Sequence, residues 1–223
     1  MKLIPILFST PMVQAILSGD KSMTRRTKGL DKINKTPNEF RFDGADIADD
    51  YSRSWKSVWF EGLIDGKPTE KYSQIKNPYG QPGDVLWVRE KFCIIKPEID
   101  YEFVYFTEED YDPKECKWKP NIHMPFAACR IFLRVKEIRV ERLQDIKTKD
   151  IAREGVQSTY TNPKMGARHE NAMYIQFQTL WININGADSW NANPWVWVIA
   201  FERVTAEKEI AEIRKLWSER RAK

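Results

Sequence analysis

Residues 3–26 read LIPILFSTPMVQAILSGDKSMTRR and decide how the fold begins. Residues 4–8 form an apolar run of strand length. Pro11 then stands in the first turn of a predicted helix, where its missing N–H removes no hydrogen bond. Gly19 ends that helix. We therefore expect residues 20–26 at a helix exit near the surface, where polar side chains can form a site.

Outward from this stretch, the hydrophobic pattern predicts an α+β domain. Strands are expected at residues 55–64, 85–88, 102–106, 129–140 and 195–204, and helices at residues 148–154 and 172–184. Polar segments predict loops at residues 28–52, 107–121 and 159–171. Short helices between strands, without a regular βαβ rhythm, favour a mixed or antiparallel β-barrel with peripheral helices. We predict one domain over residues 1–204, with inserted loops at residues 28–52 and 107–121, and a basic amphipathic helix over residues 205–223.

Composition limits the class of protein. The chain has 223 residues, of which 42% are apolar, and its mean hydropathy is negative. No stretch approaches the roughly twenty apolar residues of a membrane span, so we expect no membrane partner. The net charge of +4 leaves only local basic surfaces, and the densest lies in the C-terminal helix. For that helix a solvated outer face is the preferred interpretation, and a nucleic-acid arm is the alternative.

The cysteines predict a reducing compartment. Cys93, Cys116 and Cys129 are an odd number with no CxxC spacing, which favours the cytoplasm over a disulfide framework. A zinc site from Cys116, His123 and Cys129 would match no familiar ligand spacing. We therefore assign no metal and no cofactor.

A compact set of reactive side chains follows the first helix. Lys21 and Thr24 are three residues apart, which is one helical or turn repeat, so their side chains can meet. A lysine whose pKa is lowered by burial, or by Arg25 and Arg26, can act as the base for a hydroxyl nucleophile. Arg26 can hold an anion or a carbonyl oxygen. On chemistry alone, an exposed basic turn is the simpler interpretation.

The spacing G-x-K-x-x-T-x-R at residues 19–26 resembles the signature of the ASCH family, a branch of the PUA-like barrel superfamily. Four further segments are similar to segments of phage and prophage ASCH proteins: PGD at 82–84, ERLQDI at 141–146, AREG at 152–155 and NPWVWVIAFERV at 193–204. The resemblance runs from about residue 3 to residue 204. It implies the ASCH fold.

The resemblance also implies a chemistry. Small bacterial ASCH enzymes that deacetylate N4-acetylcytidine are thought to use a lysine, a threonine and a glutamate. By position, Lys21 and Thr24 match the first two. Glu154 is the candidate for the third, and Glu90, at the end of the strand after PGD, is the alternative. Lys21 would take the proton of Thr24, Thr24 would attack the acyl carbon, Arg26 or loop N–H groups would hold the oxyanion, and Glu154 would assist proton transfer.

Two other functions stay open. One is a non-catalytic module that binds a modified base or a single strand of RNA or DNA, with the basic cluster on phosphate and an aromatic side chain stacked on a base. The other is a metal-independent ribonuclease that uses the same cluster. The candidate ligand-binding residues are Arg25, Arg26, Glu90, Trp190, Asn191 and Asn193. Trp195 and Trp197 are expected in the core, and the oligomeric state is left open.

Overall fold

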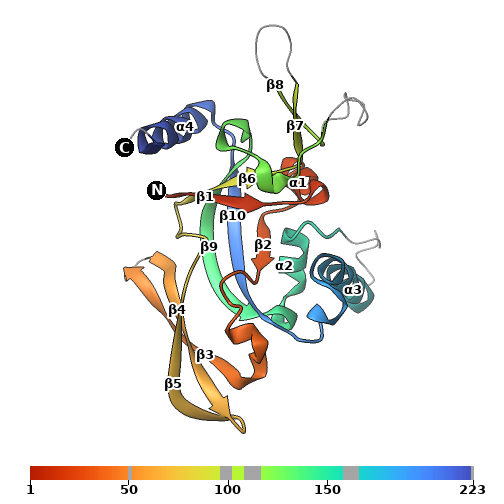
Figure 1. The fold of residues 1–223 in the computed structure, drawn as a ribbon. Coiled ribbons are helices and arrows are strands. Elements are labelled where there is room, and N and C mark those ends of the chain that lie inside the picture. The colour runs from red at the N-terminus through yellow and green to blue at the C-terminus, as the bar shows by residue number, and fades with distance from the viewer. Residues whose placement is uncertain (50–51, 96–101, 108–116, 158–165, 222–223) are drawn as a thin grey trace. The chain divides into compact units, whose positions relative to one another are not determined.

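The computed structural model of the chain describes residues 1–49, 52–95, 102–107, 117–157 and 166–221, and it has the α+β composition that the sequence predicts (Figure 1). The helices are α1 (Thr10–Leu17), α2 (Thr148–Arg153), α3 (Gly166–Asn185) and α4 (Glu207–Arg221). The strands are β1 (Leu3–Leu7), β2 (Met23–Arg26), β3 (Phe40–Asp49), β4 (Ser52–Ile64), β5 (Lys67–Lys76), β6 (Val85–Arg89), β7 (Phe92–Ile95), β8 (Glu102–Tyr105), β9 (Phe132–Arg142) and β10 (Trp195–Val204). Among the described residues, no helix is both long and apolar enough to cross a lipid bilayer.

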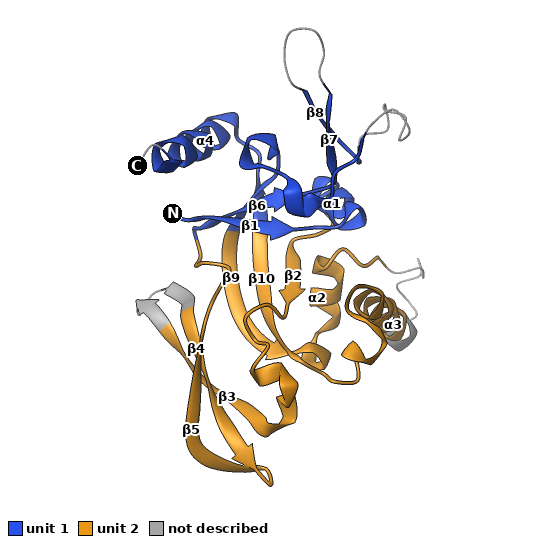
Figure 2. Ribbon diagram, in the orientation of Figure 1, with its two compact units in different colours: residues 1–19, 83–134, 202–223 blue, residues 20–82, 135–201 orange. Residues whose placement is uncertain are grey.

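The chain forms two compact units, each built from separate segments (Figure 2). Unit 1 holds residues 1–19, 83–134 and 202–223, and unit 2 holds residues 20–82 and 135–201. The sequence predicted one domain over residues 1–204, and whether the two units fold as one cooperative domain stays a prediction.

Unit 1 is built on β1, which pairs in parallel with β6, while β6 pairs in antiparallel fashion with the first residues of β9. The β7–β8 hairpin belongs to the same unit. Ile213 of α4 is fully buried in an aromatic core with Phe126 and Phe132, and Trp217 and Ile210 pack against that core. The apolar stripe predicted for the C-terminal helix is therefore the face that it packs against the unit.

Unit 2 contains β2, which pairs in antiparallel fashion with β10, and β10 neighbours β9. Every residue of β10 from Trp195 to Phe201 is buried, as its continuous apolar run predicts. Met173 and Phe177 of α3 lie in one core cluster with Val198 of β10. A second sheet in this unit, with the order β3-β4-β5, is antiparallel throughout.

The predicted barrel is not formed by the described residues. In the described part of the chain, β1 and β2 are the two edge strands of the five-stranded sheet: β1 pairs only with β6, and β2 pairs only with β10. The sheet is therefore open. A barrel requires its two edge strands to pair with one another. Alternation within a strand predicts a buried face, but it does not specify which edges meet.

The predicted loop at residues 28–52 is wrong for residues 40–49, which form β3. This strand pairs with β4 along most of its length, but its register shifts between Phe42 and Gly44 and again between Asp46 and Ile47. The first shift inserts Asp43 into β3, whereas the second inserts Lys56 into β4. β3 also contains Asp43, Gly44, Asp46 and Asp49, residue types that are depleted in strands, so its composition predicts a loop.

Other predicted boundaries also moved. The α3 helix begins at Gly166, within the predicted loop at 159–171, while residues 158–165 lie outside the described residues. Most of the loop predicted at 107–121 lies outside them too. The strand expected at 102–106 is present as β8, and it pairs with β7.

The cysteines differ from the expectation of free thiols. Cys93 is disulfide-bonded. Cys129 is a free and buried thiol, and burial raises its pKa to about 12. The expectation of a chain without disulfides is therefore wrong, and the cytoplasmic location stays a prediction.

Candidate functional site

The start of β2 and the end of α2 bring Lys21 and Glu154 together in unit 2. The two residues form an isolated antiparallel bridge, and the Ser22 N–H donates to the Arg153 carbonyl at 2.9 Å. Gly155 follows with a φ of 85°, in the left-handed region that glycine adopts without steric cost. The glycine lets the chain turn away directly after Glu154, so the glutamate stays against Lys21.

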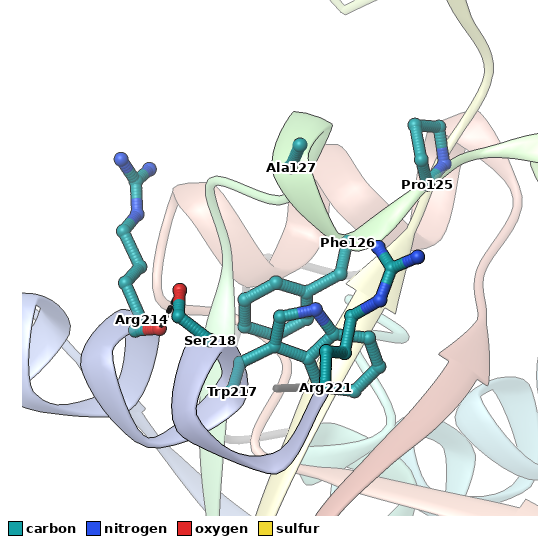
Figure 3. Close-up of a pocket in the computed structure, with 7 residues that line it drawn as sticks. All are labelled: Pro125, Phe126, Ala127, Arg214, Trp217, Ser218 and Arg221. Atoms are coloured by element: carbon teal, nitrogen blue, oxygen red, sulfur yellow. Dashed lines mark hydrogen bonds between the residues drawn. The ribbon is translucent and has the colours of Figure 1, made fainter. Parts of the chain in front are cut away.

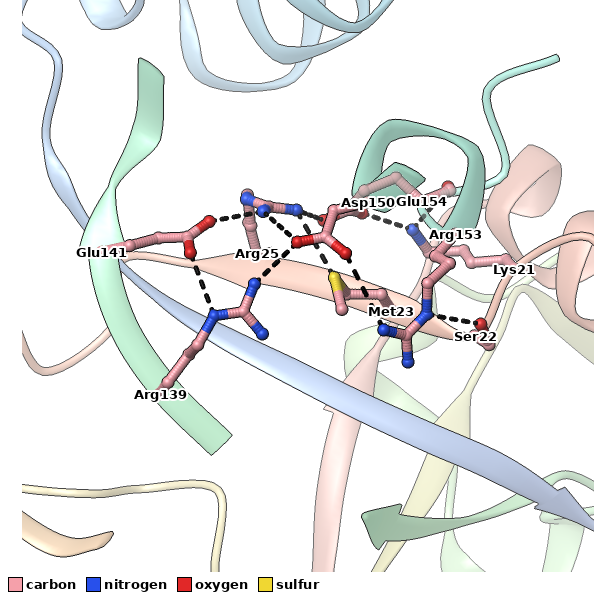
Figure 4. A network of polar contacts seen from close by, with 9 residues as sticks. All are labelled: Lys21, Ser22, Met23, Arg25, Arg139, Glu141, Asp150, Arg153 and Glu154. Carbon is pink, nitrogen blue, oxygen red and sulfur yellow. Dashed lines mark hydrogen bonds and ion pairs between the residues drawn. The ribbon is translucent and has the colours of Figure 1, made fainter. Parts of the chain in front are cut away.

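Lys21 and Glu154 form a buried ion pair (Figure 4). The Lys21 Nζ atom lies 2.7 Å from Glu154 Oε2 and donates a second hydrogen bond to the Glu154 carbonyl at 2.8 Å. The two residues are only 3% and 6% exposed. The lysine is therefore fixed against one carboxylate oxygen and one backbone oxygen.

Arg25 occupies the other oxygen of the same carboxylate. Its Nη1 atom donates to Glu154 Oε1 at 3.0 Å, and its Nη2 atom donates to Glu141 Oε1 at 2.5 Å. The guanidinium also lies 5.9 Å from the ring centroid of Phe177. Each oxygen of Glu154 thus has its own cationic donor.

An outer set of ion pairs holds this arrangement. Arg139 donates from Nε to Glu141 at 3.0 Å and from Nη2 to Asp150 at 2.7 Å. Arg153 lies 3.8 Å from Asp150. Buried charges are stable only when each is paired and hydrogen-bonded. The network meets that requirement by linking the three carboxylates to four basic side chains.

The surroundings of Lys21 favour loss of its proton. Burial lowers the pKa of Lys21 below 10.5, the nearby Glu154 carboxylate opposes that change, and the positive charges of Arg26 and Arg25 add to it. A lysine with a lowered pKa and a carboxylate hydrogen-bonded to it form a pair that can accept and donate protons. The geometry therefore suits general acid–base chemistry.

Thr24 lies in the middle of β2, opposite Ile199 of β10, and is 1% exposed. Because side chains alternate along a strand, Thr24 shares a face with Arg26, and Met23 shares the opposite face with Arg25. The helical or turn repeat that we expected between Lys21 and Thr24 is therefore absent. Within the described part of the chain, no hydrogen bond links Thr24 to Lys21.

Arg26, which is partly buried, and Tyr79, which is buried, form a second feature of unit 2. Burial lowers the pKa of Arg26, and electrostatic interactions with Tyr79 and Glu154 oppose that change. Tyr79 is 6% exposed, and burial raises its pKa to about 12 although Arg26 acts in the opposite direction. Tyr79 therefore stays a neutral phenol that can donate a hydrogen bond beside a guanidinium.

The predicted base-stacking residue belongs to the core. Trp190 is 5% exposed and meets the rings of Tyr174 and Phe177 edge to face, at centroid distances of 5.3 and 6.1 Å. Asn193, with a φ of 42°, accepts a hydrogen bond from the Gln144 N–H. Both residues stabilise the chain before β10. Asn191 is exposed on that segment.

Two further residues that we predicted to bind a ligand, Arg25 and Glu90, instead form ion pairs within the chain. The Arg25 side chain is 1% exposed and bound by carboxylates, so it does not present its charge to a ligand. Glu90 belongs to unit 1, where Arg130 binds its carboxylate through Nε at 3.0 Å and Nη2 at 3.1 Å. Thr107 lies within 3.4 Å of the same carboxylate.

Sequence reasoning missed the residues that hold Arg25 in place. Arg139 and Glu141 are two residues apart on one strand and so share a face, and Asp150 and Glu154 are four residues apart at the end of a helix. Those spacings were the available signal. The spacings predict that the two residues of each pair lie on the same face of their strand or helix. They do not predict that these faces contact Arg25 of β2.

Comparison of the chain with protein-family models, with curated proteins and with solved structures found no match.

Proposed function

We propose that this chain is a hydrolase that removes the acyl group from the exocyclic amine of an N4-acylated cytosine base or nucleoside, with Lys21 and Glu154 as its proton-transfer pair. The observation that carries the proposal is the buried Lys21–Glu154 contact of 2.7 Å, together with the lowered pKa of Lys21. Perturbed titratable pairs of this kind are typical of catalytic sites.

The reaction follows from the roles that these groups can take. Lys21, in its neutral form, accepts the proton of the Thr24 hydroxyl, whose oxygen attacks the acyl carbon. Arg26 and Tyr79 stabilise the oxyanion, because one is cationic and the other stays a neutral donor. The protonated Lys21 then gives its proton to the departing cytosine amine, and water releases the acyl group from Thr24.

The first step requires the Thr24 hydroxyl to come within hydrogen-bond distance of Lys21 Nζ when substrate binds. Catalytic hydrogen bonds are often long or unformed without a ligand and shorten in the substrate complex. Glu154 supports the step because its carboxylate stabilises the ammonium that forms on Lys21.

The charge balance favours a neutral substrate over a phosphodiester. Of the three residues that would bind phosphate in a binding module, Lys21, Arg25 and Arg26, the first two are buried and face three carboxylates. A phosphate there would have to displace Glu154 and would meet Glu141 and Asp150. An acylated base carries no such charge, so the hydrolase is the function that the geometry supports best.

Release of cytidine from N4-acetylcytidine by the purified protein tests the proposal. We expect turnover by the wild type, and a loss of about 10³-fold or more for Thr24→Ala because the nucleophile is removed. Thr179→Ala removes an exposed hydroxyl from α3 and should leave the rate unchanged. An inactive wild type, or an active Thr24→Ala, would refute the proposed reaction.

A further inference from the structure

A second cluster of chemically active side chains lies in unit 1, beside α4. A groove of about 700 Å³ runs between α4 and the short turn at Phe126–Ala128, and its size suits a small ligand or one unit of a polymer (Figure 3). Its lining residues are Pro125, Phe126, Ala127, Arg214, Trp217, Ser218 and Arg221.

Helical spacing puts the polar lining on one face of α4. Arg214, Trp217, Ser218 and Arg221 follow one another at intervals of three, one and three residues, which is the pattern of a single helix face. The two arginines are therefore two turns apart, or roughly 10 Å along the axis. Figure 3 shows their side chains on either side of the Trp217 indole.

The floor of the groove is aromatic and fixed in place. Trp217 stacks on Phe126 with ring centroids 4.1 Å apart and an interplanar angle of 12°, and its edge contact with Trp87 is 5.8 Å between centroids. Trp217 itself is partly exposed. A planar ligand would therefore meet an indole whose orientation is already set.

The charge of the groove is not neutralised by the protein. No carboxylate is among the lining residues, and in the described part of the chain neither Arg214 nor Arg221 forms an ion pair. Arg214 donates to the Cys129 carbonyl at 3.3 Å, which leaves its charge uncompensated. By contrast, Arg130 and Arg134 of the same unit are paired with Glu90 and Glu209.

We propose that this groove binds a single strand of nucleic acid, with Arg214 and Arg221 on phosphates and a base against Trp217. Two unpaired guanidinium groups separated by two helical turns suit the repeated charges of a phosphodiester backbone. The aromatic floor suits a base, which can stack on Trp217. An acidic peptide carries repeated charges but has no planar base to stack there. This inference does not depend on the proposed hydrolase, because binding is measured without turnover.

Fluorescence anisotropy with labelled oligouridylate and oligothymidylate, titrated at several salt concentrations, tests the groove. In the double variant Arg214→Gln/Arg221→Gln, we expect affinity at low salt to fall by about tenfold or more. The slope of log affinity against log salt should fall by roughly 0.7 for each arginine removed. Arg214→Lys/Arg221→Lys keeps both charges and should keep most of the slope.

The matched control is Lys208→Gln/Lys215→Gln, which removes the same charge from exposed positions of α4 outside the groove. It should lower affinity by less than about threefold. Equal losses in the two double variants would overturn the site, as would a wild type that binds no oligonucleotide at low salt.

Two further probes separate the ligand classes. Uridine monophosphate should bind far more weakly than the oligonucleotide, because it offers one phosphate where the groove has two cations. Polyglutamate of matched charge should also bind more weakly, because it has no base. Equal affinity for polyglutamate would mean that the groove accepts any polyanion and would overturn the assignment to nucleic acid.

Discussion

At the scale of single residues, the two oxygens of Glu154 bind two different cations. Oε2 accepts from Lys21 and Oε1 accepts from Arg25. Arg25 is in turn fixed by Glu141. We infer that Arg25 positions Glu154, whereas the sequence suggested that it binds a ligand.

Removing Arg25 should therefore destabilise the protein strongly. We expect Arg25→Gln to lower the free energy of unfolding by about 3–5 kcal/mol, because Glu154 and Glu141 would lose a buried partner. Urea unfolding measures the change. Arg203→Gln, which removes an exposed guanidinium, should change stability by less than about 0.5 kcal/mol. Equal effects of the two substitutions would contradict the positioning role.

The pH dependence of the proposed reaction depends on Lys21. A base acts in its deprotonated form, so the rate should rise with pH through the pKa of Lys21, which burial lowers below 10.5. Arg25 adds to that lowering, so in any Arg25→Gln protein that stays folded the rise should move to higher pH. A pH–rate profile of each protein, with lysine Nζ signals followed by NMR, measures the shift. A profile that falls as the pH rises would exclude Lys21 as the base.

At the scale of elements, the end of α2 depends on one backbone conformation. Gly155 has a φ of 85°, and a side chain there would be strained. Gly155→Ala should lower the free energy of unfolding by roughly 1–2 kcal/mol. The control is Gly44→Ala in β3, where φ is not positive and an added Cβ would meet no atom within 4 Å. Thermal unfolding of both variants gives the comparison, and a stable Gly155→Ala would show that the turn tolerates other conformations.

Elements with an uninterrupted pattern were predicted well from sequence. β10 and α1 lie almost where the apolar run and the Pro and Gly signals put them. β3 was missed because its Asp and Gly residues are typical of loops. The partner of β8 was also missed, since alternation within a strand carries no information about its neighbour. For the candidate site, the family resemblance named Lys21 and Glu154, which lie in contact in the structure. Their catalytic roles stay predictions.

At the scale of the whole molecule, the contacts of the site join residues far apart in the chain. Lys21 and Glu154 are separated by 133 positions, and Arg25 and Glu141 by 116. Local patterns do not specify such pairings, which is why the outer ion pairs were not foreseen. The same fact means that the site forms only when distant segments have folded.

We expect the chain to unfold in one cooperative transition. Each unit is assembled from separated segments, and both β9 and β10 contribute residues to each unit. Half of a strand rarely unfolds while the other half stays paired, so the units should lose structure together. Calorimetry should give one peak whose van't Hoff and calorimetric enthalpies agree. Two resolved peaks would contradict the prediction of one domain.

The most direct test of the central claim is the rate of N4-acetylcytidine hydrolysis by Glu154→Gln. This change keeps the shape of the side chain but removes the charge that binds Lys21 at 2.7 Å. We predict that the wild type releases cytidine and that Glu154→Gln is slower by about 10²–10⁴-fold, while the exposed Glu212→Gln retains the wild-type rate. A folded Glu154→Gln protein that hydrolyses the substrate as fast as the wild type would contradict the account.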